Sequence, residues 1–210
     1  MIRDKIIIFD KKRTEADVFR IFRNICHFGD EENDMTKYAE KTAREVYDEL
    51  QVKAVISEFS SECIKDKYFE IGKNIFEVDM PTDIKKSHGL FSYIMTAGKI
   101  RERENIFEKF CADALGTAYI SYGRKILGEY LGEFSGDVIS ESIAPGYYSM
   151  KTEDVKLIFD ISDGNKIGVS VNESGMMIPE KSCAGFFIKG IKIGKKECEK
   201  CECKNCEYCI

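Results

Sequence analysis

ENIFEKFCADALGTAYISYGRKILGEYL, from Glu104 to Leu131, is the longest periodic segment of this chain. Its apolar side chains recur at intervals of three and four residues, which is the spacing of one face of an α-helix. They are Phe107, Phe110, Ala114, Ala118, Tyr122 and Ile126. Gly116 and Gly123 lie inside the segment, although Gly in a helix costs about 1 kcal/mol relative to Ala. We therefore expect one long helix that another element approaches closely at its small residues.

Strands and shorter helices are predicted on both sides of this helix. Alternating or short apolar runs indicate strands at residues 6–9, 52–56, 90–95, 167–171 and 184–188, and a hairpin over 68–78. Helical spacing predicts helices from an N-cap at Thr14, over residues 35–50, and over 153–161. Strands and helices do not alternate strictly, which argues against a doubly wound parallel sheet. The sequence therefore predicts an α+β fold with a twisted, mostly antiparallel sheet.

Composition sets limits on the class of protein. The chain has 210 residues, of which 43 % are hydrophobic, and a net charge of −5. It can therefore bury a core without disulfides. Its mixed charges exclude the basic face that nucleic-acid binding needs. No apolar run reaches the length of a membrane span and no signal peptide is visible, so we expect a cytoplasmic protein. Composition changes near Gly190, which suggests a domain over 1–190 and a tail over 191–210.

Motifs for common enzyme chemistry are missing from the sequence. It has no G-x-S-x-G, no H-E-x-x-H and no glycine-rich phosphate loop. The two histidines, His27 and His88, stand in no metal-ligand spacing, and we interpret both as surface or packing residues. The sequence therefore predicts no catalytic acid, base or nucleophile.

Two loop segments stand out. In Ser142-Ile-Ala-Pro-Gly-Tyr-Tyr148, proline fixes one backbone angle, and Gly146 permits a positive φ and close approach of a ligand. The two tyrosine rings could then stack on a base or face a cation. The second segment, 172–182, is long for a hairpin connection, and long ordered loops are often functional. The alternatives are a turn with a packed aromatic ring and an irregular crossover with methionines in the core.

Taken together, these loops resemble a known family. Ala-Pro-Gly-Tyr at 144–147, followed by Glu-Ser at 173–174 with Pro179 and Ser182, is similar to the activation (reactivation) domain of cobalamin-dependent methionine synthase. The resemblance covers about residues 90–189, matches residues 1–89 only loosely, and is strongest to stand-alone activation-domain-like proteins. It implies an α+β fold with a bent antiparallel sheet.

The resemblance also implies a function. Such domains bind S-adenosylmethionine in a shallow groove and support the reductive methylation of cob(II)alamin, and the cobalamin is held by the partner. The expected partner is a corrinoid-binding methionine synthase or a related methyltransferase, with flavodoxin or ferredoxin as electron donor. Carried over by position, Ala144, Gly146 and Tyr147 match the residues that hold S-adenosylmethionine. Glu173 and Ser174 match the Glu-Ser of the second loop.

Two positions depart from the family pattern. Ser142 stands where an arginine clamps the carboxylate of the ligand, so the bidentate contact of a guanidinium is absent there. Thr117 stands where the family has an acidic residue that contacts the ligand. These departures leave an alternative open, a non-enzymatic metal-binding or iron–sulfur electron-transfer accessory protein that has lost S-adenosylmethionine binding.

Five of the nine cysteines lie in the last thirteen residues, with the spacing C-x2-C-x-C-x2-C-x2-C. They are Cys198, Cys201, Cys203, Cys206 and Cys209. Zinc could take four of these thiolates, while the last three have the compact spacing of an iron–sulfur run. A reduced tail that binds metal adventitiously is the third alternative. We favour an iron–sulfur cluster, because corrinoid reduction needs a low-potential electron.

The remaining cysteines are scattered through the chain. We interpret them as small core residues rather than metal ligands. They are Cys26, Cys63, Cys111 and Cys183.

Overall fold

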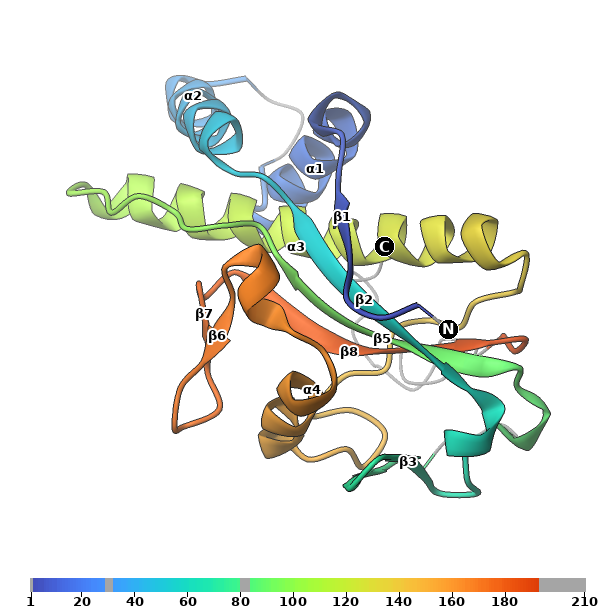
Figure 1. The fold of residues 1–210 in the computed structure, drawn as a ribbon. Helices are drawn as coiled ribbons and strands as arrows, with labels where there is room; N and C mark the ends of the chain where they lie inside the picture. Colours follow the sequence, from blue (N-terminus) through green and yellow to red (C-terminus); the bar gives the residue numbers. More distant parts are fainter. Residues whose placement is uncertain (1, 29–31, 80–83, 193–210) are drawn as a thin grey trace.

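The computed structural model describes residues 2–28, 32–79 and 84–192 (Figure 1). The strands are β1 (Lys5–Ile8), β2 (Lys53–Ser60), β3 (Tyr68–Ile71), β4 (Asn74–Glu77), β5 (Gly89–Thr96), β6 (Ser170–Val171), β7 (Met177–Ile178) and β8 (Ser182–Lys189). The α-helices are α1 (Lys11–Ile25), α2 (Asp34–Glu49), α3 (Ile106–Ser135) and α4 (Val155–Ile161). Short 3₁₀ helices are η1 (Ser61–Cys63), η2 (Ile84–Lys86), η3 (Thr152–Asp154) and η4 (Gly164–Ile167).

The main sheet has four strands in the order β1-β2-β5-β8. Each neighbouring pair is antiparallel. Two small hairpins, β3–β4 and β6–β7, stand apart from this sheet. The α+β prediction with an antiparallel sheet is therefore confirmed. The strand predictions for 6–9, 52–56, 90–95 and 184–188 correspond to its four strands.

The two faces of the sheet bury two different cores. Helices α1, α2 and α3 cover one face, and α4 with the β3–β4 hairpin covers the other (Figure 1). Strand β5, one of the two inner strands, is buried along its whole length and contributes side chains to both cores. Tyr93 and Met95 pack on the helical side, whereas Leu90 and Ile94 pack on the hairpin side. Period-two alternation explains this division, because successive strand residues point to opposite faces.

The long helix α3 matches its prediction closely. The Asn105 side chain accepts hydrogen bonds from the first backbone amides, and Gly136 ends the helix in the left-handed conformation. A Cβ added to Gly123 would lie 3.3 Å from Met95, and one added to Gly116 would lie 2.8 Å from Ile100. The small residues therefore let the sheet and a neighbouring loop approach the helix, as the sequence indicates.

Two local predictions are wrong. The N-cap of α1 is Asp10, whose side chain accepts from the Lys12 amide, while Thr14 is buried inside the helix and donates to the Lys11 carbonyl. Asp and Thr are both good N-caps, and the strand that ends just before Asp10 decides between them. The strand expected over 167–171 shrinks to β6, because the chain first forms η4 with Asp163 as its cap.

The cysteine predictions are tested only in part. Cys111 is fully buried, as expected, while Cys26, Cys63 and Cys183 are partly buried. The five tail cysteines lie outside the described residues, so their metal predictions stay predictions. In the part of the chain that the structure describes, no helix is both long and apolar enough to cross a membrane.

Candidate functional site

The first candidate loop, residues 142–148, lies against the edge strand β8. Ile143 and Phe186 exchange two backbone hydrogen bonds of 2.8 and 2.7 Å, which form an isolated antiparallel bridge. The bridge fixes Ile143 beside β8, and Ala144 is the next residue of the loop. Edge strands offer unpaired backbone groups, and here this loop takes up part of that edge.

Gly185 allows the loop to come this close. A Cβ at that position would lie 2.3 Å from the Ile143 carbonyl oxygen and 3.2 Å from the Ala144 Cα. Both are backbone atoms, so no side-chain rotation could relieve the contact. Any larger residue at position 185 would therefore displace the loop.

The loop itself turns sharply after Pro145. The Tyr147 amide donates to the Ala144 carbonyl at 3.0 Å, and the Gly146 amide donates to the Met150 carbonyl at 2.9 Å. Gly146 has φ of +93°, as the sequence predicts, and Tyr148 and Ser149 also have positive φ. Non-glycine residues in that region store strain, which is commonest at functional sites. Tyr147 is 54 % exposed, so its ring is available to a ligand.

Polar groups converge beneath this loop, on the helical side of the sheet. The hydroxyls of Tyr93 and Ser142 lie 2.6 Å apart in a hydrogen bond. The Cys183 thiol and the Arg124 guanidinium lie beside the Tyr93 hydroxyl, and Arg124 is also within electrostatic reach of Tyr147. We call these five residues the Arg124 cluster. It joins β5, β8, α3 and the loop.

Burial and charge shape the titration of this cluster. Burial raises the pKa of the Tyr93 phenol, against the opposing effect of Arg124. Burial also raises the pKa of Cys183 to about 11, so this thiol stays protonated at neutral pH. For Arg124 burial acts to lower the pKa, but Tyr93, Cys183 and Tyr147 outweigh it and the pKa is raised. The cluster therefore carries one permanent positive charge next to neutral donors and acceptors.

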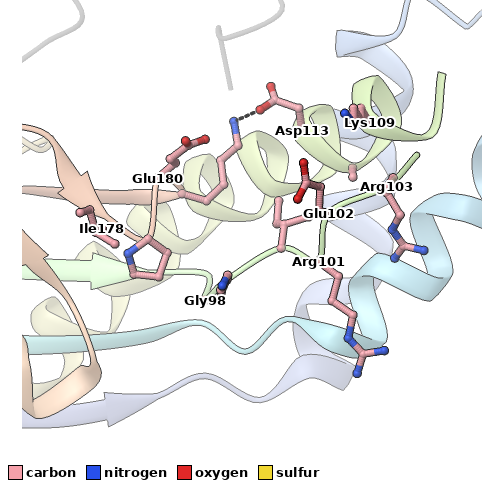
Figure 2. Close-up of a pocket in the computed structure, with 13 residues that line it drawn as sticks. Gly98, Arg101, Glu102, Arg103, Lys109, Asp113, Ile178 and Glu180 are labelled. Carbon is pink, nitrogen blue, oxygen red and sulfur yellow. Dashed lines mark ion pairs between the residues drawn. The ribbon is translucent and has the colours of Figure 1, made fainter. Parts of the chain in front are cut away.

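A pocket of about 890 Å³ lies beside the first turns of the same helix, N-terminal to Arg124. Figure 2 shows residues 98–103 on one side, the first turns of α3 on another, and residues 178–181 closing it. The pocket carries both signs of charge. Its lining includes Lys99, Arg101, Glu102, Arg103, Lys109, Asp113, Glu180 and Lys181.

Lys181, which lines the pocket, contacts the face of α3 that also carries Arg124. Its Nζ is 2.5 Å from Asp113 Oδ1 (Figure 2) and donates to Thr117 Oγ1 at 3.1 Å. Asp113, Thr117 and Arg124 recur at i, i+4 and i+11, so they share one face of α3. From Thr117 to Arg124 the helix rises about 10 Å. This face thus runs from the pocket to the Arg124 cluster.

The second candidate loop has a local structure of its own. Glu173 and Ser174 lie in the turn of the β6–β7 hairpin, and both are exposed. The Lys156 ammonium donates to the Glu173 carbonyl, and Asn172 Oδ1 accepts from the Met176 amide at 2.9 Å. Within the described ranges, neither residue forms a hydrogen bond or ion pair with Ala144, Gly146 or Tyr147. The structure therefore brings the first-loop residues together and leaves the Glu-Ser pair on a separate turn.

Metal binding finds no support within the globular part. Among the described residues, no group of three or more His, Cys, Asp or Glu side chains could hold a metal ion. The zinc and iron–sulfur predictions rest on the tail cysteines, which lie outside the described residues.

Comparison with known proteins finds a likeness in structure. No family model and no curated protein matches the sequence. The crystal structure of the MetH reactivation domain bound to AdoHcy (S-adenosylhomocysteine) is similar, with a TM-score of 0.53 and 16 % identity, over 88 % of this chain and 78 % of that one. This chain shares the fold of the MetH reactivation domain. A match over 88 % of this chain is longer than the segment 90–189 and must include much of residues 1–89. The N-terminal part therefore belongs to the shared fold too.

Several residues of the site were missed by sequence reasoning. Arg124 reads as an ordinary exposed cation on a helix, and Tyr93 reads as a core strand residue. Gly185 was hidden inside an apolar strand, although Gly in a strand interior is a signal of close backbone approach. That signal could have found the position of the loop, whereas the cluster needs the packing of α3 on the sheet.

Proposed function

We propose that this chain is a stand-alone activator of a corrinoid-dependent methyltransferase, with cobalamin-dependent methionine synthase as the partner. The observation that carries the proposal is the fold shared with a reactivation domain that binds AdoHcy. The Ala-Pro-Gly-Tyr loop seated against β8 adds to it. AdoHcy is what remains of S-adenosylmethionine after its methyl group has left, so a fold that holds one can present the other.

In this proposal, S-adenosylmethionine lies along the face of α3 beside the first loop. Ala144 and Gly146 contact it through the backbone, and the exposed ring of Tyr147 packs on it. Glu173 and Ser174 are proposed as further contacts, which requires the β6–β7 turn to approach the ligand. Residues 1–190 form the activating domain, and residues 191–210 form a metal-binding tail.

The chemistry needs little from the side chains. One electron, from flavodoxin or ferredoxin, reduces cob(II)alamin on the partner to cob(I)alamin. This nucleophile takes the methyl group from the sulfonium, and methylcobalamin and AdoHcy are the products. The sulfonium is reactive by itself, so the protein has to bind and orient it rather than act as acid or base.

The test is an anaerobic reactivation assay. A methionine synthase preparation without its own reactivation domain is converted to the cob(II)alamin form and mixed with reduced flavodoxin and S-adenosylmethionine. We expect this chain to accelerate the appearance of the methylcobalamin absorption spectrum, and omission of S-adenosylmethionine to abolish the effect. Identical rates with and without the chain would refute the proposal for this partner.

A second candidate function is a metal-binding or electron-transfer accessory protein without the methyl donor. Ser142 favours it, because the family arginine is missing at that position and the serine hydroxyl is held by Tyr93. Such a protein would change the rate of cob(II)alamin reduction equally with and without S-adenosylmethionine. Anaerobic purification with iron, sulfide and zinc analysis and an EPR spectrum would distinguish an iron–sulfur tail from a zinc tail.

A further inference from the structure

The departure at Ser142 removes a guanidinium from the loop, yet the Arg124 guanidinium reaches the tyrosine that is hydrogen-bonded to Ser142. Arg124 projects from α3 to the Tyr93 hydroxyl, which is 2.6 Å from Ser142 Oγ. The positive charge is thus supplied from the helix rather than from the loop. It stands next to the Tyr147 side chain, which the proposed function already assigns to the ligand.

Among the described residues, Arg124 has no carboxylate partner of the kind that a partly buried cation normally has. In the described part of the chain it forms no ion pair with a carboxylate, and its neighbours are two phenols and a thiol. Removing a charge from water without an opposite charge is costly. An anionic ligand would supply the missing partner.

Two lysines at the two ends of β8 are already engaged in ion pairs. Lys181 lies on the same face of α3, but it is paired with Asp113 at 2.5 Å and donates to Thr117. The Lys189 ammonium is paired with Glu58 at 2.6 Å. Of these three, only Arg124 is left to meet an anion.

We propose that Arg124 binds the carboxylate of the amino-acid part of the ligand, in place of the loop arginine that Ser142 replaces. The guanidinium offers a planar fork of donors that matches a carboxylate in a bidentate contact. The hydrogen bond with Ser142 fixes the Tyr93 phenol, and the phenol in turn orients the Arg124 guanidinium. The inference rests on the proposed function, and it assigns the ligand class as an adenosyl thioether or sulfonium that carries an α-amino acid.

The test compares two ligands that differ in the amino-acid part. AdoHcy carries the carboxylate, whereas 5′-methylthioadenosine lacks the whole amino-acid group. Calorimetric titration of the full chain should show that Arg124→Met weakens AdoHcy binding at least about 10-fold, since a hydrogen bond to a charged group is lost. Binding of 5′-methylthioadenosine should be unchanged. Lys125→Met, on the exposed side of the same helix, should leave both affinities unchanged.

Further variants separate the outcomes. Arg124→Lys keeps the charge without the fork, and should bind AdoHcy with intermediate affinity even if the methionine variant folds poorly. Adding Ser142→Arg to Arg124→Met should restore part of the affinity, because it returns a guanidinium to the loop. Wild-type AdoHcy affinity in both Arg124 variants would overturn the inference and leave the proposed function standing. No binding of either ligand by the unaltered chain would overturn both.

Discussion

Gly185→Ala tests the position of the candidate loop most sharply. The new Cβ would lie 2.3 Å from the Ile143 carbonyl oxygen, below the 3.0 Å that Cβ contacts normally respect. Backbone has to move, and the two hydrogen bonds between Ile143 and Phe186 are the contacts that break. At about 0.5–1.5 kcal/mol each, their loss costs about 1–3 kcal/mol. For a chain of this size, 2 kcal/mol corresponds to about 4–8 °C in the melting temperature.

Two assays follow this substitution. Thermal or urea unfolding should show the loss of stability, and AdoHcy titration should show at least about 10-fold weaker binding, because Ala144 moves with Ile143. Gly132→Ala is the matched control, since its Cβ would lie 3.5 Å from the Asp137 carbonyl oxygen, an ordinary van der Waals distance, and Ala favours a helix. We expect that control to be neutral or stabilising. A Gly185→Ala protein with unchanged stability and unchanged affinity would refute the loop position.

Further predictions concern stability and the tail. Glu58→Gln should destabilise the fold by about 1 kcal/mol at pH 7, because the Lys189 ammonium at 2.6 Å lowers the pKa of Glu58. A carboxyl group whose pKa is lower in the folded state than in the unfolded state stabilises the fold fully above its unfolded-state pKa. This stabilisation is lost as the pH falls through the folded-state pKa. The difference in urea unfolding between wild type and variant should therefore vanish in acid, and a pH-independent difference would contradict this. Ser92→Ala should lower the free energy of unfolding by about 1–3 kcal/mol, since it leaves the buried Ser162 hydroxyl unpaired. Adding Ser162→Ala should recover part of that loss. Additive losses in the double variant would contradict this pairing. Serine in place of all five tail cysteines should remove bound zinc or iron and leave AdoHcy affinity unchanged, and metal retained at full occupancy would place it elsewhere.

Sequence periodicity predicted the elements that depend on local pattern. The long helix, the central strand and the 68–78 hairpin follow from apolar spacing, and all are found. The N-cap of α1 could not be chosen from sequence, because both Asp10 and Thr14 suit a cap and the preceding strand decides where the chain turns. The segment 167–171 looks apolar enough for a strand, but the Asp163 cap directs it first into a 3₁₀ helix.

The candidate site was predictable only in its backbone part. Ala144, Gly146 and Tyr147 lie in one short loop whose composition already predicts a turn. Arg124 precedes this loop by 18 residues at Ser142 and by more at the others. Its place beside Tyr93 and Tyr147 depends on how α3 packs over β8. No pattern within one segment carries that information, because long-range packing sets it.

Direct binding of the ligand tests the central claim. Calorimetric titration of AdoHcy into the full chain, at protein concentrations that resolve micromolar to millimolar affinity, should give a saturable 1:1 isotherm. Arg124→Met should flatten that isotherm under the same conditions. A titration of the unaltered chain with no heat of binding and no saturation would contradict the account, whatever the fold resemblance.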